Sequence, residues 1–536
     1  MNALDWTLII AYMLGMIGLS AYLKRGQVDD EDYYVGGRNL PWWAVGISTM
    51  ATQTSAISFI SIPAFVALKT GGGLTWLQYE LALPLAIIFT MIFLLPFFRK
   101  LELVSVYEYL ELRFGSSARS VVSAIFLVSR GLGTGIGVYA SGIVLSVCLG
   151  IPVWATVLLI GAVTVVYDTL GGMKAVVYSD VIQMFVLIGG LLLCIGYVAV
   201  ELGGLGAIFS SLPAERWSAL QLGTGLGDGA KMPFWAFLIG GFFLYTSYYG
   251  VDQSQVQREL SAPTIADTKR ALLFNGLARF PLTLLYIGLG MAAFAMYAHS
   301  AALRDAVPAD RLDELVPELI LLKIPTGLRA ILFAAILSAA MSSLDSSLNS
   351  LSAATVRDFI EKYYKPSPKR QLLVGRLTTV AWGVVLTGFA LMFCVVNPAE
   401  TVIEGINKIG SLFYGPILAA FLVGLLWKKP STPDAICGLI SGIAANICLW
   451  VVAGDAVHWM WWNVVGLSAA ILATWISSLL TPDPDPDKVK EYTLSKTGFH
   501  KETRRWWRTY LTLCVYFFVI LAVIVSCTLY GLSLNR

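Results

Sequence analysis

The stretch 331–354 reads ILFAAILSAAMSSLDSSLNSLSAA and contains one charged residue, Asp345. A helix of this length crosses roughly 30 Å of hydrocarbon, so the composition indicates a membrane-spanning segment. Five of its polar residues follow one another at helical offsets, which places them on one face of the helix. They are Ser338, Ser342, Asp345, Ser346 and Asn349. Because polar groups are costly in contact with lipid, this face is predicted to contact protein or water.

The rest of the chain has the same membrane character. Of its 536 residues, 57% are hydrophobic and 13% are charged, and the mean hydropathy is +0.73. A soluble domain with this composition would expose a large apolar surface, so the fold class is predicted to be all-α and integral to the membrane. We predict about fourteen transmembrane helices. They lie at 4–23, 42–69, 76–97, 119–149, 151–170, 176–201, 233–255, 273–298, 327–356, 375–396, 403–427, 434–453, 459–480 and 509–531.

Lys and Arg residues concentrate in alternate loops. With the N-terminus outside, the cytoplasmic loops hold about 26 of them and the outer loops about 8. This bias predicts a multi-pass protein of a bacterial-type inner membrane, with the N- and C-termini outside. The first segment has no basic n-region and no small-residue cleavage site, which indicates a retained helix. Because the Lys and Arg residues concentrate in the cytoplasmic loops, the net charge of +3 indicates membrane topology and not nucleic-acid binding.

The sequence contains no catalytic constellation. The seven cysteines lie within or at the ends of apolar spans without metal-ligand spacing, and the three histidines lie at span ends or in a tail. A Ser/His/Asp arrangement and a glycine-rich phosphate loop are both missing. The chain is therefore predicted not to be an enzyme.

Two predicted spans are interrupted by polar residues. In 42–69 the run Thr52 to Ser55 is polar, and in 233–255 a run of Tyr, Thr and Ser precedes Asp252. Unwound backbone at membrane depth is tolerated only where it lines a cavity. Two interrupted helices, each opening a five-helix unit, are typical of inverted-repeat transporters, whose site lies where the repeats meet.

Five runs of sequence carry a family resemblance. They are YYVGGRNLPWWAVGISTMATQTSAISF at 33–59, SVYEYLELRFG at 105–115, GGMKAVVYSDVIQMFVLIGG at 171–190, YYGVDQSQVQRELSA at 248–262 and SSLDSSLNSLSAATVRDF at 342–359. In this order they resemble the sodium:solute symporter family, which includes sodium-glucose, sodium-iodide and sodium-multivitamin transporters. The second and third runs are more similar to the iodide and multivitamin branch than to the sugar branch. None of these five runs identifies the transported solute.

The resemblance implies a LeuT-like core of two inverted five-helix repeats and sodium as the coupling ion. The expected parts are an extra helix and cytoplasmic loop at 1–40, a first repeat at 41–232, a second repeat at 233–430, two additional helices at 431–480, a cytoplasmic linker at 481–508 and a last helix at 509–536. The expected partners are a small-molecule solute and the lipid bilayer, without nucleic acid. The sequence does not set the oligomeric state, and we expect a monomer to be functional.

Residue-by-residue transfer places the family's sodium site between the interrupted span 42–69 and the polar face of 331–354. The main-chain carbonyl ligands correspond to Ala51, Thr54 and Ala339, and the hydroxyl ligands to Ser342 and Ser343. A broken helix and hydroxyl side chains supply the oxygen atoms that such a cation needs. Small hydroxyl residues also serve as ordinary packing in membrane helices, which is the alternative for the two serines.

Some family members bind a second sodium through an acid and two further side chains. The matching residues are Asp180, Asp345 and Ser346. Asp345 is a carboxylate where those members have a hydroxyl, so two acids would share the site and one could carry a proton. One sodium, two sodium ions and sodium with a proton all remain open, as does a plain interfacial charge for Asp180.

The matched solute positions are rich in tyrosine. They are Ser58, Tyr79, Glu80, Tyr139, Tyr245, Tyr248, Tyr249 and Arg279. Tyr248 has the position of the family's inner gate residue. These aromatic rings would cap the pocket, or alternatively pack with their hydroxyl groups satisfied.

Arg130 lies inside the predicted span 119–149, where an unpaired guanidinium is costly. Sialic acid transporters of the resembled family hold the substrate carboxylate with an arginine on the same helix, about one turn from Arg130. Arg130 therefore binds either an anionic solute or a buried acid such as Glu80.

We conclude from the sequence that the chain carries out sodium-coupled symport of a small polar organic solute, with a carboxylate, by alternating access. The alternative is sodium-coupled transport of a neutral sugar or polyol. A passive channel is a remote alternative, because a channel is expected to line its pore with rings of like groups. A membrane-embedded sensor would need a signalling domain, and the cytoplasmic segments are too short to fold one.

Overall fold

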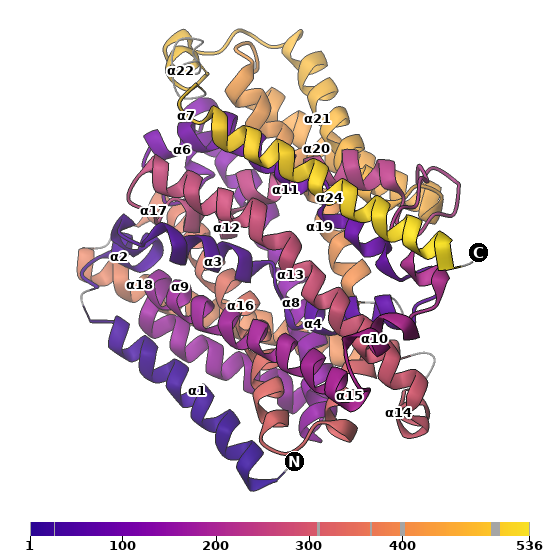
Figure 1. The fold of residues 1–536 in the computed structure, drawn as a ribbon. Coiled ribbons are helices and arrows are strands. Elements are labelled where there is room, and N and C mark those ends of the chain that lie inside the picture. Colours follow the sequence, from indigo (N-terminus) through magenta and orange to yellow (C-terminus); the bar gives the residue numbers. More distant parts are fainter. Residues whose placement is uncertain are drawn as a thin grey trace.

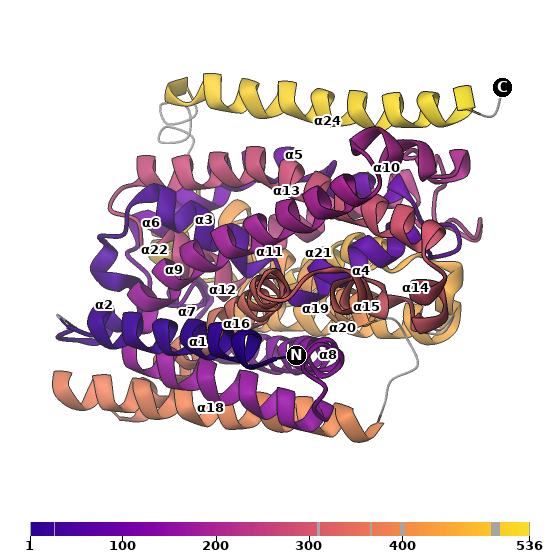
Figure 2. The ribbon, with the colours of Figure 1, turned by 60° about the horizontal axis from the view of Figure 1, so that its bottom comes forward.

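The computed structural model describes residues 2–25, 27–307, 311–364, 367–396, 402–494 and 504–534. Within these ranges the regular structure is helical, and the only β pairing is one bridge between Leu226 and Val457. Figure 2 shows α24 (Trp507–Leu534) along one side of the molecule and α18 (Pro368–Val396) along the opposite side. The all-α architecture predicted from the sequence is confirmed.

Ten helices lie before residue 212 in the described part of the chain, and five of them have only six or seven residues. In order they are α1 (Ala3–Leu23), α2 (Asp30–Val35), α3 (Trp42–Thr52), α4 (Ala56–Ala67), α5 (Leu83–Phe89), α6 (Leu95–Lys100), α7 (Glu108–Phe114), α8 (Ser116–Leu149), α9 (Val153–Glu201) and α10 (Leu205–Ser211). Helical turns at Leu74–Glu80 and Thr90–Leu94 join α5 and α6 into one apolar span, Leu74–Lys100.

The later helices continue in the same manner (Figure 1). They are α11 (Gly241–Gly250), α12 (Gln253–Glu259), α13 (Ile265–His299), α14 (Ala301–Ala306), α15 (Leu315–Lys323), α16 (Leu328–Thr355), α17 (Glu361–Tyr363), α18, α19 (Val402–Leu426), α20 (Thr432–Ala453), α21 (Trp462–Ser478), α22 (Pro486–Glu491) and α24. A π-helical turn, Ala236–Gly240, leads into α11.

Eleven helices in the described residues are long and apolar enough to cross a membrane, or twelve if one bent pair counts as a further span. The sequence predicted about fourteen. Two features explain the difference. The predicted spans 151–170 and 176–201 correspond to the two arms of α9, which count as one span, and the predicted span 233–255 is divided among pieces that are each too short to qualify.

α9 consists of two arms that meet at Gly172. This residue is non-helical, with φ +53° and ψ −153°. A Cβ atom at Gly172 would lie 2.5 Å from the backbone oxygen of Tyr33. Only glycine adopts this conformation and close approach without strain, so Gly172 sets the boundary between the two arms.

Both interruptions expected from the sequence are present. α3 and α4 are bent by 58° across the break between Thr52 and Ala56. α11 ends at Gly250 and α12 begins at Gln253, where the Asp252 carboxylate accepts the N–H of Ser254 at 2.9 Å. This is the usual N-cap arrangement. Both breaks leave helix-terminal backbone groups inside the molecule.

α16 lies at the centre of the molecule. Within its apolar window 89% of the residues are buried, whereas the value is 17% for α1 and for α24. α16 packs against α8 and α9, and its polar stripe is buried. The stripe therefore contacts protein, as the sequence predicted, while α1 and α24 form the periphery.

Candidate functional site

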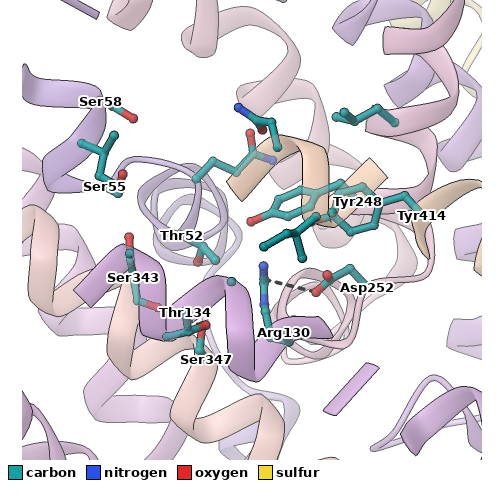
Figure 3. Close-up of a pocket in the computed structure, with 18 of the residues that line it drawn as sticks. Thr52, Ser55, Ser58, Arg130, Thr134, Tyr248, Asp252, Ser343, Ser347 and Tyr414 are labelled. Atoms are coloured by element: carbon teal, nitrogen blue, oxygen red, sulfur yellow. Dashed lines mark hydrogen bonds and ion pairs between the residues drawn. The ribbon is translucent and has the colours of Figure 1, made fainter. Parts of the chain in front are cut away.

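A cavity of about 220 Å³ lies where the two helix breaks meet α8, α16 and α19. Figure 3 shows Thr52 and Ser343 on one side of it, Tyr248 and Tyr414 on the other, and Arg130 between them. Its polar lining residues are Thr52, Gln53, Ser55, Ser58, Tyr79, Ser129, Arg130, Thr134, Tyr245, Tyr248, Asp252, Arg279, Ser343, Ser347, Asn407 and Tyr414. Apolar residues such as Ile57, Ile62 and Val138 complete the wall.

Six of the solute residues predicted from the sequence line this cavity. They are Ser58, Tyr79, Arg130, Tyr245, Tyr248 and Arg279. The other three lie outside its lining. Glu80 is buried behind it, Tyr249 donates from its hydroxyl to Asn275 Oδ1 at 3.4 Å, and the Tyr139 ring lies 6.3 Å from that of Phe393.

Arg130 forms an ion pair with Asp252. Its Nη2 atom lies 3.3 Å from Asp252 Oδ1 and also donates to the Ser254 hydroxyl. The guanidinium lies 5.4 Å from the centre of the Tyr248 ring. Arg130 Nε is buried without a hydrogen-bond partner. The acid that pairs with Arg130 is thus Asp252, and Nε, a buried donor of this cavity-lining residue, has no partner in the protein.

Glu80 pairs with Arg279 instead. Arg279 Nε donates to Glu80 Oε1 at 3.2 Å, and Arg279 Nη1 donates to Gln53 Oε1 at 2.7 Å. Thr283 also donates to Glu80 Oε1, at 3.0 Å, and Tyr245 donates to Glu80 Oε2 at 3.3 Å. Arg279 therefore connects α13 to the α3–α4 break while its charge is balanced.

The two hydroxyls expected at the sodium site differ in their bonding. Ser343 lines the cavity, and its Oγ is buried without a hydrogen-bond partner. Ser342 donates to Asp180 Oδ1. Among the backbone ligands, the Ala51 oxygen accepts the Thr54 N–H at 2.8 Å. An unsatisfied hydroxyl beside a helix break is compatible with a hard monovalent cation, which binds through oxygen atoms.

The residues matched to a second cation site form a buried network around Arg258. Arg258 Nη2 donates to Ser346 Oγ at 2.5 Å and lies 3.7 Å from Asp180 Oδ2. Asp345 accepts the Tyr167 hydroxyl at 2.5 Å. Arg258 therefore occupies the space between Asp180 and Ser346, and its charge offsets that of the acids.

Sequence reasoning missed several members of this network. Asp168 is fully buried in α9, and Arg258 is 1% exposed in α12. Arg258 lies just beyond the end predicted for the span 233–255, so it was not treated as a residue at membrane depth. Asp168 lies inside the predicted span 151–170, and a charged residue there was an available signal. In the part of the chain that the structure describes, no three His, Cys, Asp or Glu side chains gather as a metal cluster.

The family model of the sodium:solute symporter family matches residues 33–442. The sodium/sialic acid symporter of Aliivibrio fischeri is 28% identical over 500 residues, covering 92% of this chain and 97% of that protein. The human sodium/iodide cotransporter is 30% identical over 450 residues, covering 82% of this chain and 68% of that protein. The human sodium-coupled monocarboxylate transporter 1 is 29% identical over 455 residues, covering 84% of this chain and 72% of that protein.

Solved structures agree with this relationship. A substrate-bound, outward-open Na⁺-coupled sialic acid symporter superimposes with a TM-score of 0.80 at 26% identity, covering 90% of this chain and 99% of that one. The nucleobase-cation symporter Mhp1 in a closed conformation gives a TM-score of 0.54 at 13% identity, covering 86% of this chain and 97% of that one, which shows a shared LeuT-like fold alone. The chain therefore belongs to the sodium:solute symporter family and is a sodium-coupled membrane transporter, not an enzyme.

Proposed function

We propose that the protein couples the entry of sodium to the uptake of a small carboxylate-bearing solute by alternating access. The observation that carries the proposal is Arg130, whose Nε lacks a partner at the wall of the central cavity. A guanidinium binds a carboxylate through parallel charge-assisted hydrogen bonds. Two kinds of relative, sodium/sialic acid symporters and sodium-coupled monocarboxylate transporters, carry names that specify carboxylates.

In this proposal sodium binds between the α3–α4 break and α16. The ligands are the backbone oxygens of Ala51, Thr54 and Ala339 and the hydroxyls of Ser342 and Ser343. Ser343 also lines the solute cavity. A cation bound there would fix the wall that the solute contacts, so each ligand would bind more tightly in the presence of the other.

A neutral sugar or polyol is the second candidate. Its support is the charge balance of the cavity, because Arg130 is paired with Asp252 and Arg279 with Glu80. The wall also offers many hydroxyl groups, such as those of Thr52, Ser55 and Ser58. An uncharged solute would use these groups and leave both ion pairs in place.

The test is uptake by purified protein in liposomes under an inward sodium gradient. Sialic acid and lactate represent carboxylates, and glucose and inositol represent neutral solutes. Saturable uptake of a carboxylate that disappears when potassium replaces sodium supports the proposal. Uptake of the neutral solutes alone supports the second candidate, and linear, sodium-independent flux contradicts both.

A further inference from the structure

Asp168 of α9 is a buried acid that belongs to neither the proposed sodium site nor the lining of the central cavity. The residue is 0% exposed, and among the described residues neither of its carboxyl oxygens has a hydrogen-bond partner. By contrast, Asp180 accepts hydrogen bonds from two serine hydroxyls, and Asp345 accepts one from Tyr167. Asp168 therefore lacks the polar contacts that normally accompany a buried carboxyl group.

Four titratable groups interact electrostatically with the Asp168 carboxyl group. They are Tyr33 of α2, Asp180 of α9, Arg258 of α12 and Asp345 of α16. The two acids oppose the ionisation of Asp168, whereas Arg258 favours it. The buried Tyr33 hydroxyl is hydrogen-bonded to Thr379 at 3.1 Å. The charge of Asp168 thus depends on how far Arg258 is engaged elsewhere.

The cations of this region already have partners of their own. Arg258 lies 3.7 Å from Asp180 and donates to a backbone oxygen of its own helix at 2.5 Å. Lys174, beyond the α9 junction, lies 3.7 Å from an acid of α2, and Arg376 of α18 donates to a glutamine side chain at 2.9 Å. Within the described ranges no ion pair joins these cations to Asp168. Its carboxyl group is therefore left without a counter-charge in direct contact.

A carboxyl group in these surroundings is most stable in its neutral form. Burying an unpaired carboxylate costs far more free energy than burying the protonated acid, so such a group takes up a proton. The absence of both a hydrogen-bond donor and an ion-pair partner therefore points to a cation bound at Asp168. The candidates are a proton and a sodium ion.

The amide group next to Asp168 favours the proton. Asn349 of α16 neighbours the carboxyl group. Its Oδ1 accepts the Gln257 Nε2–H at 2.7 Å, which leaves the donor Nδ2 as the amide atom without a hydrogen-bond partner. An N–H donor suits a carboxyl oxygen and cannot bind a cation. A proton needs one oxygen atom, whereas sodium is coordinated by several.

The position of Asp168 in α9 gives the proton a route of exchange. Asp168 lies one turn before Gly172, where the two arms of α9 meet, and α9 packs against α16. Alternating access moves groups of helices against one another. A movement at this junction would open the contact between α9 and α16 and admit water to the carboxyl group. The proton would then be bound in one conformation and released in another.

We propose that Asp168 binds a proton in the conformation described here and exchanges it with water during each transport cycle. The proton site is distinct from the residues matched to the two cation sites. This inference rests on the proposed function for its transport readout, because carboxylate uptake is the process that pH alters.

The first measurement is the pH profile of uptake into liposomes, with the same pH on both sides and a constant sodium gradient. Sialic acid and lactate are the probes. An aspartic acid in contact with water is largely ionised above about pH 5, so rebinding of the proton becomes rarer as the pH rises. Wild-type uptake should fall by at least about tenfold between about pH 5.5 and about pH 8.5. In Asp168→Asn, which is always neutral, the fall should be less than about twofold.

The second measurement, thermal unfolding of the purified chain, needs no solute. The folded protein holds a proton on Asp168 at pH values where the unfolded chain has lost it, so this contribution to stability decreases as the pH rises. The melting temperature of the wild type should therefore fall more steeply with pH than that of Asp168→Asn, by about 1 to 3 °C per pH unit.

Asp434→Asn is the matched control. The Asp434 carboxylate is buried but accepts hydrogen bonds from the hydroxyl groups of Ser431, Ser477 and Thr481. These contacts stabilise its ionised form, so both pH profiles of this variant should follow those of the wild type. Asp168→Ser, which is neutral and smaller, replaces Asp168→Asn if the latter yields little folded protein.

Equal pH dependence of the wild type and Asp168→Asn in both measurements overturns the proton site, since ordered water then stabilises an ionised carboxylate. A raised half-saturation concentration of sodium with an unchanged pH profile also overturns it and assigns Asp168 to a sodium site. If the wild type takes up neither probe, the proposed function fails, and thermal unfolding still decides the proton site.

Discussion

Arg130 and Arg279 line the same cavity but are held differently. Arg279 donates from Nε to Glu80 and from Nη1 to Gln53, so it is bound on two sides. Arg130 uses Nη2 for Asp252 and Ser254, while its Nε has no partner. Of the two guanidinium groups, Arg130 is therefore the one with a buried donor, Nε, that has no hydrogen-bond partner in the protein.

Arg130→Lys is expected to weaken the binding of an anionic solute by more than about tenfold, because an ammonium group cannot reproduce the planar fork of a guanidinium. Sodium binding should persist. Solute and sodium affinities are measured separately on the purified variant. Normal transport by Arg130→Lys would show that Arg130 is a structural partner of Asp252 and that the preference for anions is wrong.

Asp252 is both the ion-pair partner of Arg130 and the N-cap of α12. Asp252→Asn removes the charge and keeps a capping side chain. Asparagine is also a good N-cap residue, so α12 should keep its start. The Arg130 charge is then released, and we expect a carboxylate solute to bind about tenfold more tightly while a neutral solute is unaffected. Equal changes for charged and neutral solutes in competition assays would argue against a contact between Arg130 and the solute.

Ser343→Ala removes the only hydroxyl at the proposed sodium site that lacks a hydrogen-bond partner. The half-saturation concentration of sodium should rise by about tenfold, with little loss of folded protein. Ser350→Ala is the control on the same helix, because its hydroxyl donates to the backbone oxygens of Ser346 and Ser347. Unchanged sodium dependence of uptake in Ser343→Ala would remove Ser343 from the site.

At the scale of helices, the important features are the breaks, where non-helical residues interrupt a membrane span. The break at Gln53–Ser55 was visible in the sequence as a polar run, and the break before α12 as a polar run ending at Asp252. The junction within α9 was predicted as a boundary between two spans. The sequence did not indicate that a single residue, Gly172, would form it.

Gly172→Ala should destabilise the protein by roughly 1 to 3 kcal/mol, because alanine is strained at positive φ and its Cβ would meet the Tyr33 oxygen. Gly189→Ala, in the same helix, is the control, since no atom lies within 4 Å of a Cβ placed there. Thermal unfolding of both purified variants measures the difference. Equal melting temperatures would show that the α9 junction relaxes without cost.

At the scale of the whole molecule, buried charges from distant helices meet beside α16. Asp168 and Asp180 come from α9, Asp345 from α16 and Arg258 from α12. Arg258 forms an ion pair with Asp180, at 3.7 Å. Removing one partner of a buried ion pair costs roughly 3 to 5 kcal/mol of stability. The loss of stability on substitution is therefore expected to differ among these groups, according to whether the residue replaced is an ion-pair partner.

Asp345→Asn removes one of three acids and keeps the contact between Arg258 and Asp180. If Asp345 belongs to a second cation site, the steepness of the sodium dependence of uptake should fall in this variant. Measurements at two pH values distinguish a second sodium ion from a proton. Retained folding with an unchanged sodium curve would assign Asp345 a structural role.

Features that depend on a residue and its neighbours along one helix could be predicted from the amino-acid sequence. The membrane class, the polar face of α16, the two helix breaks and the family follow from hydropathy, helical spacing and motifs. Polar groups are costly in contact with lipid, so a polar residue inside an apolar span can be recognised in the sequence as one that faces protein or water. The count of about fourteen spans is not confirmed by the eleven or twelve found in the described residues, because the two arms of α9 count once and the region 233–255 is divided into short helical pieces.

The pairing of groups from different helices could be seen only once the helices were packed together. Arg130 and Asp252 are 122 residues apart, and Arg258 comes from a different helix than Asp180. Two connecting segments that are distant in the sequence likewise meet through a hydrogen bond from the Gly227 N–H to the Ala456 oxygen. The sequence shows that a charged residue lies at membrane depth and therefore requires a partner. The identity of that partner is set by how helices distant in sequence pack, because the energy of an ion pair depends on the distance between its atoms and on their burial.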